Sequence, residues 1–200
     1  MNQNTSSAVM QQRTEPDDSL DDFPTPPWGT RALCEYLKFD GSLTCREPAA
    51  NRGHMVKSLK EYFKEVIASD IFDYGAGFPV SDYLFPDSIV TDWTITNPPF
   101  RLAEQFIHLA MDQSRFGVAV IVRTAFLESI GRYENLFSRV RPSHVLQFVE
   151  RVVMHKGKLS EKGSTATAYC WIVWQNKKTE RTEFDWIAPC RKRLERAGDY

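Results

Sequence analysis

The sequence predicts an α/β protein built on a doubly wound, mostly parallel sheet with helices on both faces. Segments with helical spacing of apolar residues alternate with strand-like segments along most of the chain. Residues 116–122 form a nearly continuous apolar run, as expected for a strand buried on both faces. The last two strand-like segments, 144–150 and 167–174, follow each other without a helix between them, which predicts an antiparallel hairpin at the end of the sheet.

The first element is a helix expected over residues 29–38. Leu33, Tyr36 and Leu37 would share one face of that helix. The proline-rich segment before it, residues 23–28, is expected to be extended, because proline disfavours helical geometry at the preceding residue.

The remaining elements alternate along the chain. Residues 89–96 are rich in β-branched side chains, which favours a strand. Phe106, Leu109 and Ala110 recur at helical spacing. In all, we expect strands at 42–47, 65–70, 89–96, 116–122, 144–150 and 167–174, and helices at 52–63, 102–113 and 129–140.

The length of 200 residues suits a single domain, expected over residues 23–200. Residues 1–22 are polar and then acidic, without aromatic side chains, and are expected to form a disordered tail. No apolar run approaches the roughly 18 residues that cross a bilayer, and the N-terminus lacks an apolar signal segment. We therefore expect a cytoplasmic protein without a membrane partner. Its composition leaves the oligomeric state open.

The four cysteines predict no metal site. They are scattered along the chain, without a CxxC pair and without histidine at zinc-ligand spacing. Reduced, mostly buried thiols are expected at Cys34, Cys45, Cys170 and Cys190.

Charge is distributed unevenly, although the net charge is only -1. Residues 1–22 hold one arginine against five acidic residues, a charge of -4. Residues 151–200 hold eleven Lys or Arg against six Asp or Glu, a charge of +5. A basic C-terminal part fits contact with phosphates, and an ordinary solvated surface fits it equally well.

The most informative segment is Thr96-Asn97-Pro98-Pro99-Phe100, directly after an apolar strand. In open α/β sheets, ligands bind beyond the carboxyl ends of the strands. The Asn97 side-chain oxygen and the Pro98 carbonyl can each accept one N–H of an aromatic amine, which favours a pyramidal nitrogen with its lone pair directed at an electrophile. Phe100 can stack on the aromatic ring, a contact worth about 1–3 kcal/mol. The alternative is a strand-to-helix turn with proline at the first helical positions.

Residues 92–100, DWTITNPPF, resemble the catalytic motif of the adenine-N6 DNA methyltransferases, and the resemblance extends over roughly residues 23–174. It implies S-adenosyl-L-methionine as the cofactor and a Rossmann-like methyltransferase fold with a seven-stranded sheet. It also implies that Asn97, Pro98, Pro99 and Phe100 are catalytic, with Asn97 contacting the cofactor as well.

An upstream segment resembles the cofactor loop of the same family, in which an acidic residue and a proline lead into a glycine-rich turn. The residues concerned are Glu47, Pro48, Ala49, Asn51 and Gly53. Such a loop lets the backbone approach the cofactor at a helix N-terminus. Asn51 stands where the first glycine is usual, but asparagine tolerates positive φ. An ordinary helix-capping loop is the alternative.

Two further segments resemble cofactor contacts of the family. Asp70 lies 23 positions after Glu47, near the spacing of about 20 typical of ribose-binding acidic residues. Ile71 would then pack on the cofactor adenine. A helix N-cap is the alternative for Asp70. Asp82 and Tyr83 resemble an Asp-Phe-Leu motif whose aspartate accepts from the adenine amino group, and an Asx-turn is the alternative.

The two ends of the resemblance supply the last candidates. Thr25 and Pro26 resemble an N-terminal motif that holds the methionine part of the cofactor, and a proline-rich helix start explains them equally well. Residues 151–164 lie where the family has a target-base loop. The substrate-binding candidates in that loop are Arg151, His155, Lys156 and Lys158, and a solvent-exposed histidine is the alternative for His155.

The order of the motifs resembles the γ-type, in which recognition follows the catalytic core. Only 26 residues follow Trp174, so we expect no separate recognition domain and little built-in sequence specificity. Methylation of adenine N6 in DNA, with the base flipped out of the helix, is the leading hypothesis. The alternatives are methylation of an adenine or guanine amino group in RNA, a protein-glutamine methyltransferase and a non-catalytic binding module. The glutamine enzymes usually carry Asn-Pro-Pro-Tyr instead.

Overall fold

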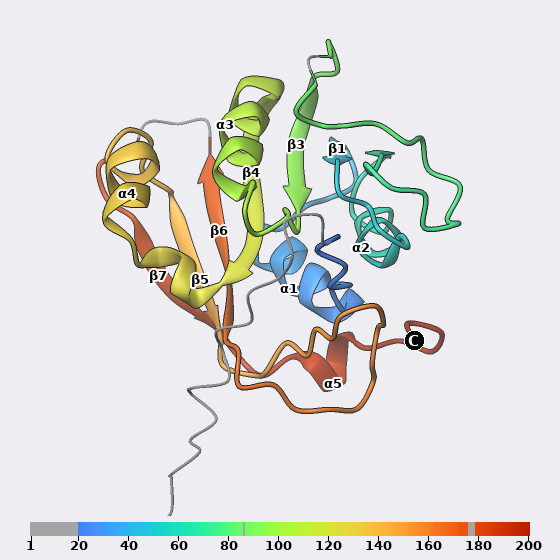
Figure 1. Cartoon of the computed structure of the whole chain (residues 1–200). Helices are drawn as coiled ribbons and strands as arrows, with labels where there is room; N and C mark the ends of the chain where they lie inside the picture. Colours follow the sequence, from blue (N-terminus) through green and yellow to red (C-terminus); the bar gives the residue numbers. More distant parts are fainter. Residues whose placement is uncertain (1–19, 86, 176–178) are drawn as a thin grey trace, which may run out of the picture.

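The computed structural model describes residues 20–85, 87–175 and 179–200. Its centre is a seven-stranded sheet in the order β2-β1-β3-β4-β6-β5-β7 (Figure 1). β6 runs antiparallel to both of its neighbours, and the other six strands point the same way. The mostly parallel sheet and its antiparallel β5–β6 hairpin are therefore confirmed. The strands are β1 (Thr44–Glu47), β2 (Glu65–Ala68), β3 (Thr91–Thr96), β4 (Ser114–Arg123), β5 (His144–Phe148), β6 (Tyr169–Gln175) and β7 (Glu183–Ile187).

Helices cover both faces of the sheet, as predicted (Figure 1). One face carries α1 (Pro27–Leu37), α2 (His54–Leu59) and α5 (Arg191–Leu194). The other carries α3 (Ala103–Gln113), α4 (Ile130–Arg132) and the π-helical turn η3 (Tyr133–Phe137). A 3-10 turn, η2 (Thr124–Leu127), follows β4. Within the described ranges, no helix is both long enough and apolar enough to cross a membrane.

The two hydrophobic cores meet at β6, whose side chains alternate between the faces of the sheet. Trp171 packs in the core beneath α1, and Ile172 packs in the core beneath α3. Both side chains are fully buried. The Trp171 indole N–H donates to the Gly29 carbonyl oxygen at 3.0 Å, which ties the middle of the sheet to α1.

All four cysteines are buried, as expected. Burial raises the pKa of Cys170 to about 12 and that of Cys190 to about 11. Thiols in such surroundings stay protonated and behave as small apolar side chains.

The prediction of one continuous helix over 129–140 is wrong. Ser129 caps α4, its hydroxyl accepting from the Arg132 N–H, but α4 has only three residues. The chain then widens into η3, closed by a bond from the Ser138 N–H to the Tyr133 carbonyl. Glycine, asparagine and serine lower the helix propensity of this segment, so packing on the sheet decides its geometry.

Several other expected elements are shorter than predicted, and local hydrogen bonds account for two of these differences. The strand expected from residue 42 begins at Thr44, because the Asp40 carboxylate accepts both the N–H and the hydroxyl of Ser42 and folds a tight turn there. The helix expected over 52–63 ends at Leu59, where tighter turns take over.

β7 and α5 were not predicted. β7 pairs in parallel with β5 and forms the edge of the sheet beyond the hairpin. Its sequence, EFDWI, alternates charged and large apolar residues, which is a strand signal. The many charges around it conceal that signal.

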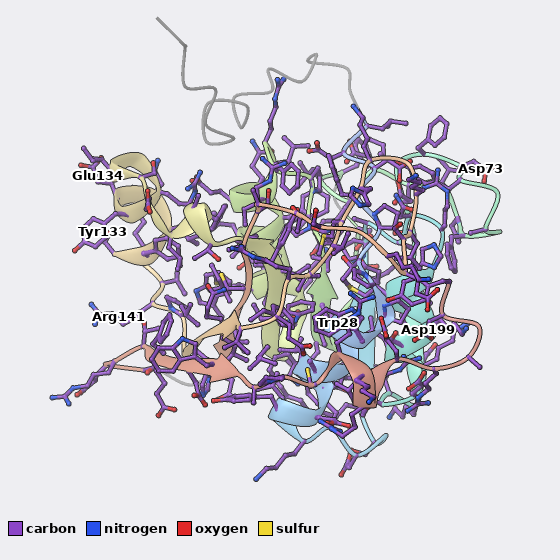
Figure 2. The ribbon with its side chains drawn as sticks, turned by 90° about the horizontal axis from the view of Figure 1, so that it is seen from below. Trp28, Asp73, Tyr133, Glu134, Arg141 and Asp199 are labelled. Atoms are coloured by element: carbon purple, nitrogen blue, oxygen red, sulfur yellow. The ribbon has the colours of Figure 1, made fainter. Side chains whose placement is uncertain are left out.

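A buried arginine joins the C-terminal segment to α1. The Arg31 guanidinium is 1% exposed and bonds both oxygens of Asp199 at 2.6 and 2.9 Å. It also bonds the Glu61 carboxylate at 2.8 Å. Figure 2 shows Asp199 on the same side of the molecule as Trp28, near the start of α1. Because a buried charge is costly without partners, this cluster anchors the end of the chain.

Candidate functional site

A pocket lies at the carboxyl ends of β1, β2 and β3, the edge of the sheet where α/β proteins bind ligands. Its walls come from the extended chain before α1, the loops after β1 and β2, and the turn after β3. The predicted site residues that line it are Thr25, Glu47, Pro48, Ala49, Asn51, Asp70, Ile71, Asp82, Tyr83, Asn97 and Pro99. The predicted residues Pro26, Gly53, Pro98 and Phe100 lie beside the lining without forming it. The structure brings these positions together, and their roles stay predictions.

The Asn97 amide is held in one orientation at the pocket wall. Its nitrogen donates to the Phe23 carbonyl oxygen at 2.9 Å and to the Thr25 hydroxyl at 3.1 Å. The Met154 sulfur lies 3.8 Å from the same nitrogen. Since a backbone carbonyl can only accept, the nitrogen must face Phe23. The side-chain oxygen is therefore the end of the amide that can accept from a ligand.

Phe100 lies at the start of an aromatic and charged cluster beside Asn97. The Phe23 ring lies 5.4 Å from the Phe100 ring, centroid to centroid. The guanidinium carbon of Arg123 lies 4.1 Å from the Phe100 ring centroid. The Phe100 N–H donates to the Asp21 carboxylate at 2.7 Å. One surface of the ring expected to stack on a base is thus already covered by a cation.

Glu47 is a buried carboxyl group at the end of β1. One oxygen accepts from the Thr96 hydroxyl at 2.6 Å and from the Ala49 N–H at 2.9 Å. Among the described residues, the other oxygen has no hydrogen-bond partner. Burial raises the pKa of Glu47 to about 8, with a further contribution from Asp70 that opposes the two hydrogen bonds. An unpartnered carboxyl oxygen at a pocket can accept a hydrogen bond from an N–H group of a ligand.

The loop after β1 has the backbone that the sequence predicts. Asn51 has a φ of 51°, in the left-handed region that asparagine tolerates. Gly53 has a φ of 84°, and an added Cβ there would lie 2.9 Å from the Phe78 ring. The Asp70 carboxylate accepts the Asn51 N–H at 2.8 Å and the Phe72 N–H at 3.0 Å. Asp70 therefore joins the two loops of the pocket, and no helix begins at it, so it is not an N-cap.

Asp82 and Tyr83 line the pocket, but both also have contacts that stabilise the fold itself. The Asp82 carboxylate accepts the Leu84 N–H at 2.9 Å, which is the Asx-turn considered as its alternative. Tyr83 is 2% exposed, packs on the Phe106 ring and lies beneath the Arg46 guanidinium. Tyr83 is thus chiefly a core residue with an edge on the pocket. Ile71 is exposed at the rim.

The segment before α1 contributes contacts that the sequence did not predict. Residues 1–19 of the expected tail lie outside the described residues, but Asp22 contacts the site. Its carboxylate accepts from Arg52 at 2.6 Å and from the Asn51 side chain at 2.8 Å. Burial acts to raise the pKa of Asp22, but these two hydrogen bonds and the positive charges of Arg52 and Lys156 together hold it below its ordinary value. Asp21 and Phe23, with their contacts to Phe100 and Asn97, belong to the same segment.

The basic loop, residues 151–164, lies beside this segment rather than in the pocket. Its base carries the buried Met154 that contacts Asn97. Further along, the Gly157 N–H donates to the Asp22 carbonyl at 2.8 Å. The four substrate-binding candidates of this loop, Arg151, His155, Lys156 and Lys158, do not line the pocket. His155 is half-buried and forms an isolated bridge with Lys158.

No protein-family model matches this chain, and no curated protein matches its sequence. Solved structures do share its fold. A type I restriction-modification methyltransferase subunit from Streptococcus thermophilus superposes with a TM-score of 0.61 at 12% identity, covering 91% of this chain and 50% of that protein. A protein described as an RNA methyltransferase from Pyrococcus horikoshii gives 0.61 at 18% identity, covering 84% and 94%.

A third structure, the 16S rRNA N2 G1207 methyltransferase of T. thermophilus in complex with AdoMet and guanosine, gives a TM-score of 0.51 at 15% identity, covering 80% and 44%. This chain thus spans half the length of the restriction-modification subunit and nearly the whole of the Pyrococcus protein. At these identities the likenesses establish the fold, which is the Rossmann-like methyltransferase fold expected from the sequence.

Proposed function

We propose that this chain is an S-adenosyl-L-methionine-dependent methyltransferase that modifies an exocyclic aromatic amino group, N6 of adenine in DNA. One observation carries the proposal. The Asn97 amide is fixed by its nitrogen at the carboxyl end of β3, with its oxygen left to accept, directly before two prolines and an aromatic ring. The shared fold supports the reaction class.

The pocket residues fit this cofactor. The unpartnered oxygen of buried Glu47 suits the cationic methionine part, which Thr25 would also contact. Asp70 and Ile71 line the same cavity and would hold the ribose and the adenine ring. Asp82 is exposed at the cavity and would accept from the adenine amino group. When bound, the cofactor supplies an electrophilic methyl group.

The chain's own residues would prepare the substrate amine. Its lone pair is delocalised into the aromatic ring, so the nitrogen is a weak nucleophile. The Asn97 side-chain oxygen and the Pro98 carbonyl would each accept one of its N–H groups and favour a pyramidal nitrogen. Phe100 would hold the ring by stacking. A strong base is unnecessary, because the methylated nitrogen is cationic and loses its proton readily.

Nucleic acid is the substrate class that the surroundings of the pocket favour. Met154, at the base of the basic loop, contacts Asn97, and the Gly157 N–H bonds the Asp22 carbonyl of the segment before α1. Lys156 and Lys158 of the same loop are exposed. Such side chains neutralise phosphates. A base inside a duplex must be flipped out to reach Asn97, at a cost of a few kcal/mol, so single-stranded substrate should react more readily than duplex.

RNA is the second candidate substrate. This chain covers only 50% of the restriction-modification subunit. It covers 94% of the Pyrococcus protein described as an RNA methyltransferase.

The experiment that tests the proposal offers labelled cofactor to separate pools of DNA, RNA and protein, followed by nucleoside mass spectrometry. N6-methyladenine in the DNA pool is the expected result. If only the RNA pool is labelled, on guanine or adenine, the substrate is RNA rather than DNA. Label in protein alone, or in no pool, would overturn the proposal.

The role of the basic loop has its own test. The double change of Lys156 and Lys158 to alanine should reduce methylation of a DNA duplex while cofactor affinity stays the same. Equal methyl incorporation by the variant and the unchanged protein would remove the loop from substrate binding.

A further inference from the structure

Arg123 is the last residue of β4, the strand next to β3 in the sheet, and it reaches over the catalytic motif candidate. Its guanidinium carbon lies 4.1 Å from the Phe100 ring centroid and 6.0 Å from that of Phe23. Phe23 lines the pocket, and its carbonyl oxygen fixes the Asn97 amide. The cation is thus held on an aromatic platform beside the residue proposed to bind the amine.

The charge of Arg123 is not neutralised in the part of the chain that the structure describes. No described carboxylate forms an ion pair with it, although Arg115 and Arg132 of neighbouring segments each have one. Asp21 is engaged with the Phe100 N–H. The Arg123 guanidinium also interacts with the Tyr169 phenol. Burial raises the pKa of Tyr169, and Arg123 acts against that effect. The Arg123 side chain is exposed, so solvent and a ligand can reach it.

An exposed guanidinium that stacks on an aromatic ring and has no carboxylate partner among the described residues can bind an anion. Stacking on an aromatic ring fixes the plane of the group, and its planar fork of donors matches phosphate or carboxylate in a two-bond geometry. A base placed against Asn97 and Phe100 would carry its sugar and phosphate outward from the pocket. The Arg123 guanidinium lies over the Phe100 ring, next to the position that such a base would occupy.

We infer that Arg123 binds a backbone phosphate next to the target nucleotide, so that the substrate is a base within a nucleic-acid strand rather than a free nucleoside or a protein side chain. This inference rests on the proposed function. It assigns a binding role to a residue outside the Asn-Pro-Pro-Phe segment, and it explains why the ring of Phe100 is paired with a cation.

Binding can be measured without catalysis, which separates this inference from the proposed reaction. The probe is a fluorescently labelled oligothymidylate with one central adenine, and its anisotropy is followed over a salt titration. Arg123→Ala should weaken binding about tenfold at 0.1 M salt. It should also lower the slope of log K against log salt by about 0.7, as expected for one phosphate contact in a single strand. Arg123→Lys should keep the slope and recover part of the affinity.

Arg141→Ala is the matched control, because it removes the same charge from a different part of the molecule. Arg141 precedes β5, at the amino end of that strand, and donates to the Glu180 carbonyl. Figure 2 shows it at the edge of the molecule, far from Trp28. Its removal should change the slope by much less.

A neutral methylphosphonate, placed at one linkage at a time, then locates the phosphate. One linkage beside the adenine should weaken binding to the unchanged protein and have little effect on Arg123→Ala. If both proteins respond alike at every linkage, or if the two alanine variants have the same slope, the inference is wrong. If binding depends on Arg123 but no methyl group is transferred, the role of Arg123 in phosphate binding is supported. The proposed methyl-transfer reaction is then wrong.

Discussion

Replacing Glu47 by glutamine should alter how stability depends on pH. The carboxyl has a pKa of about 8 in the folded chain, against an ordinary value of 4.5 when exposed. The folded state thus binds this proton more tightly than the unfolded state does. The Glu47 contribution to stability is therefore largest below pH 4.5 and is lost as the pH rises to about 8.

The size of the effect follows from the difference between the two pKa values. Roughly 3.5 pH units correspond to about 5 kcal/mol when fully developed, and about 3 kcal/mol of this is lost by pH 7. Glutamine keeps the oxygen that accepts from Thr96 and Ala49. Its new N–H₂ group lies where the carboxyl oxygen has no partner, which costs about 1–3 kcal/mol at all pH values.

Urea unfolding followed by tryptophan fluorescence, at pH 5, 6, 7 and 8, measures this difference. Glu47→Gln should be less stable than the unchanged protein at pH 5 and should gain on it by about 1 kcal/mol per pH unit up to pH 8. Glu65→Gln makes the same chemical change at an exposed residue and should run parallel to the unchanged protein. Parallel profiles for Glu47→Gln would refute the reasoning, because Glu47 would then be ionised in the folded chain.

Two further changes test the framework of the site. Asp199→Ala leaves the buried Arg31 with one carboxylate partner instead of two. It should therefore lower the free energy of unfolding by about 3 kcal/mol, and a loss below about 1 kcal/mol would show that the cluster adds little. Gly53→Ala adds a Cβ at 2.9 Å from Phe78 as well as strain at positive φ, whereas Gly41→Ala adds strain alone at a similar φ of 86°. Gly53→Ala should thus destabilise the protein by more than the roughly 1 kcal/mol expected for Gly41→Ala, and equal melting temperatures would contradict the close contact.

The fold was predictable because the signals for it are local. The apolar run of β4 and the two consecutive strands at 144–150 and 167–174 correspond to a buried parallel strand and an antiparallel hairpin. The positive φ of Asn51 also follows from residue type alone. β7 was missed because many charged residues surround its short alternating segment.

The parts of the site that could not be predicted depend on contacts between distant segments. Asp21 and Phe100 are 79 positions apart, and Phe23 and Asn97 are 74 apart. Arg123 carries no motif, and its position over Phe100 follows only from the pairing of β3 with β4. Tyr83 was expected at the cofactor and is mostly core, because the cation of Arg46 and the ring of Phe106 enclose it.

The role of Asn97 is tested most directly by measuring transfer and cofactor affinity together in Asn97→Ala. Single-turnover methyl transfer to a single-stranded oligonucleotide should fall by about 10²–10³-fold or more, as when one hydrogen-bonding group of a reacting centre is removed. Cofactor affinity should change only a few-fold. Thr25→Val removes one acceptor of the Asn97 amide but leaves its oxygen, and it should cost transfer much less. Retained transfer in Asn97→Ala, or a loss explained entirely by weaker cofactor binding, would contradict the account.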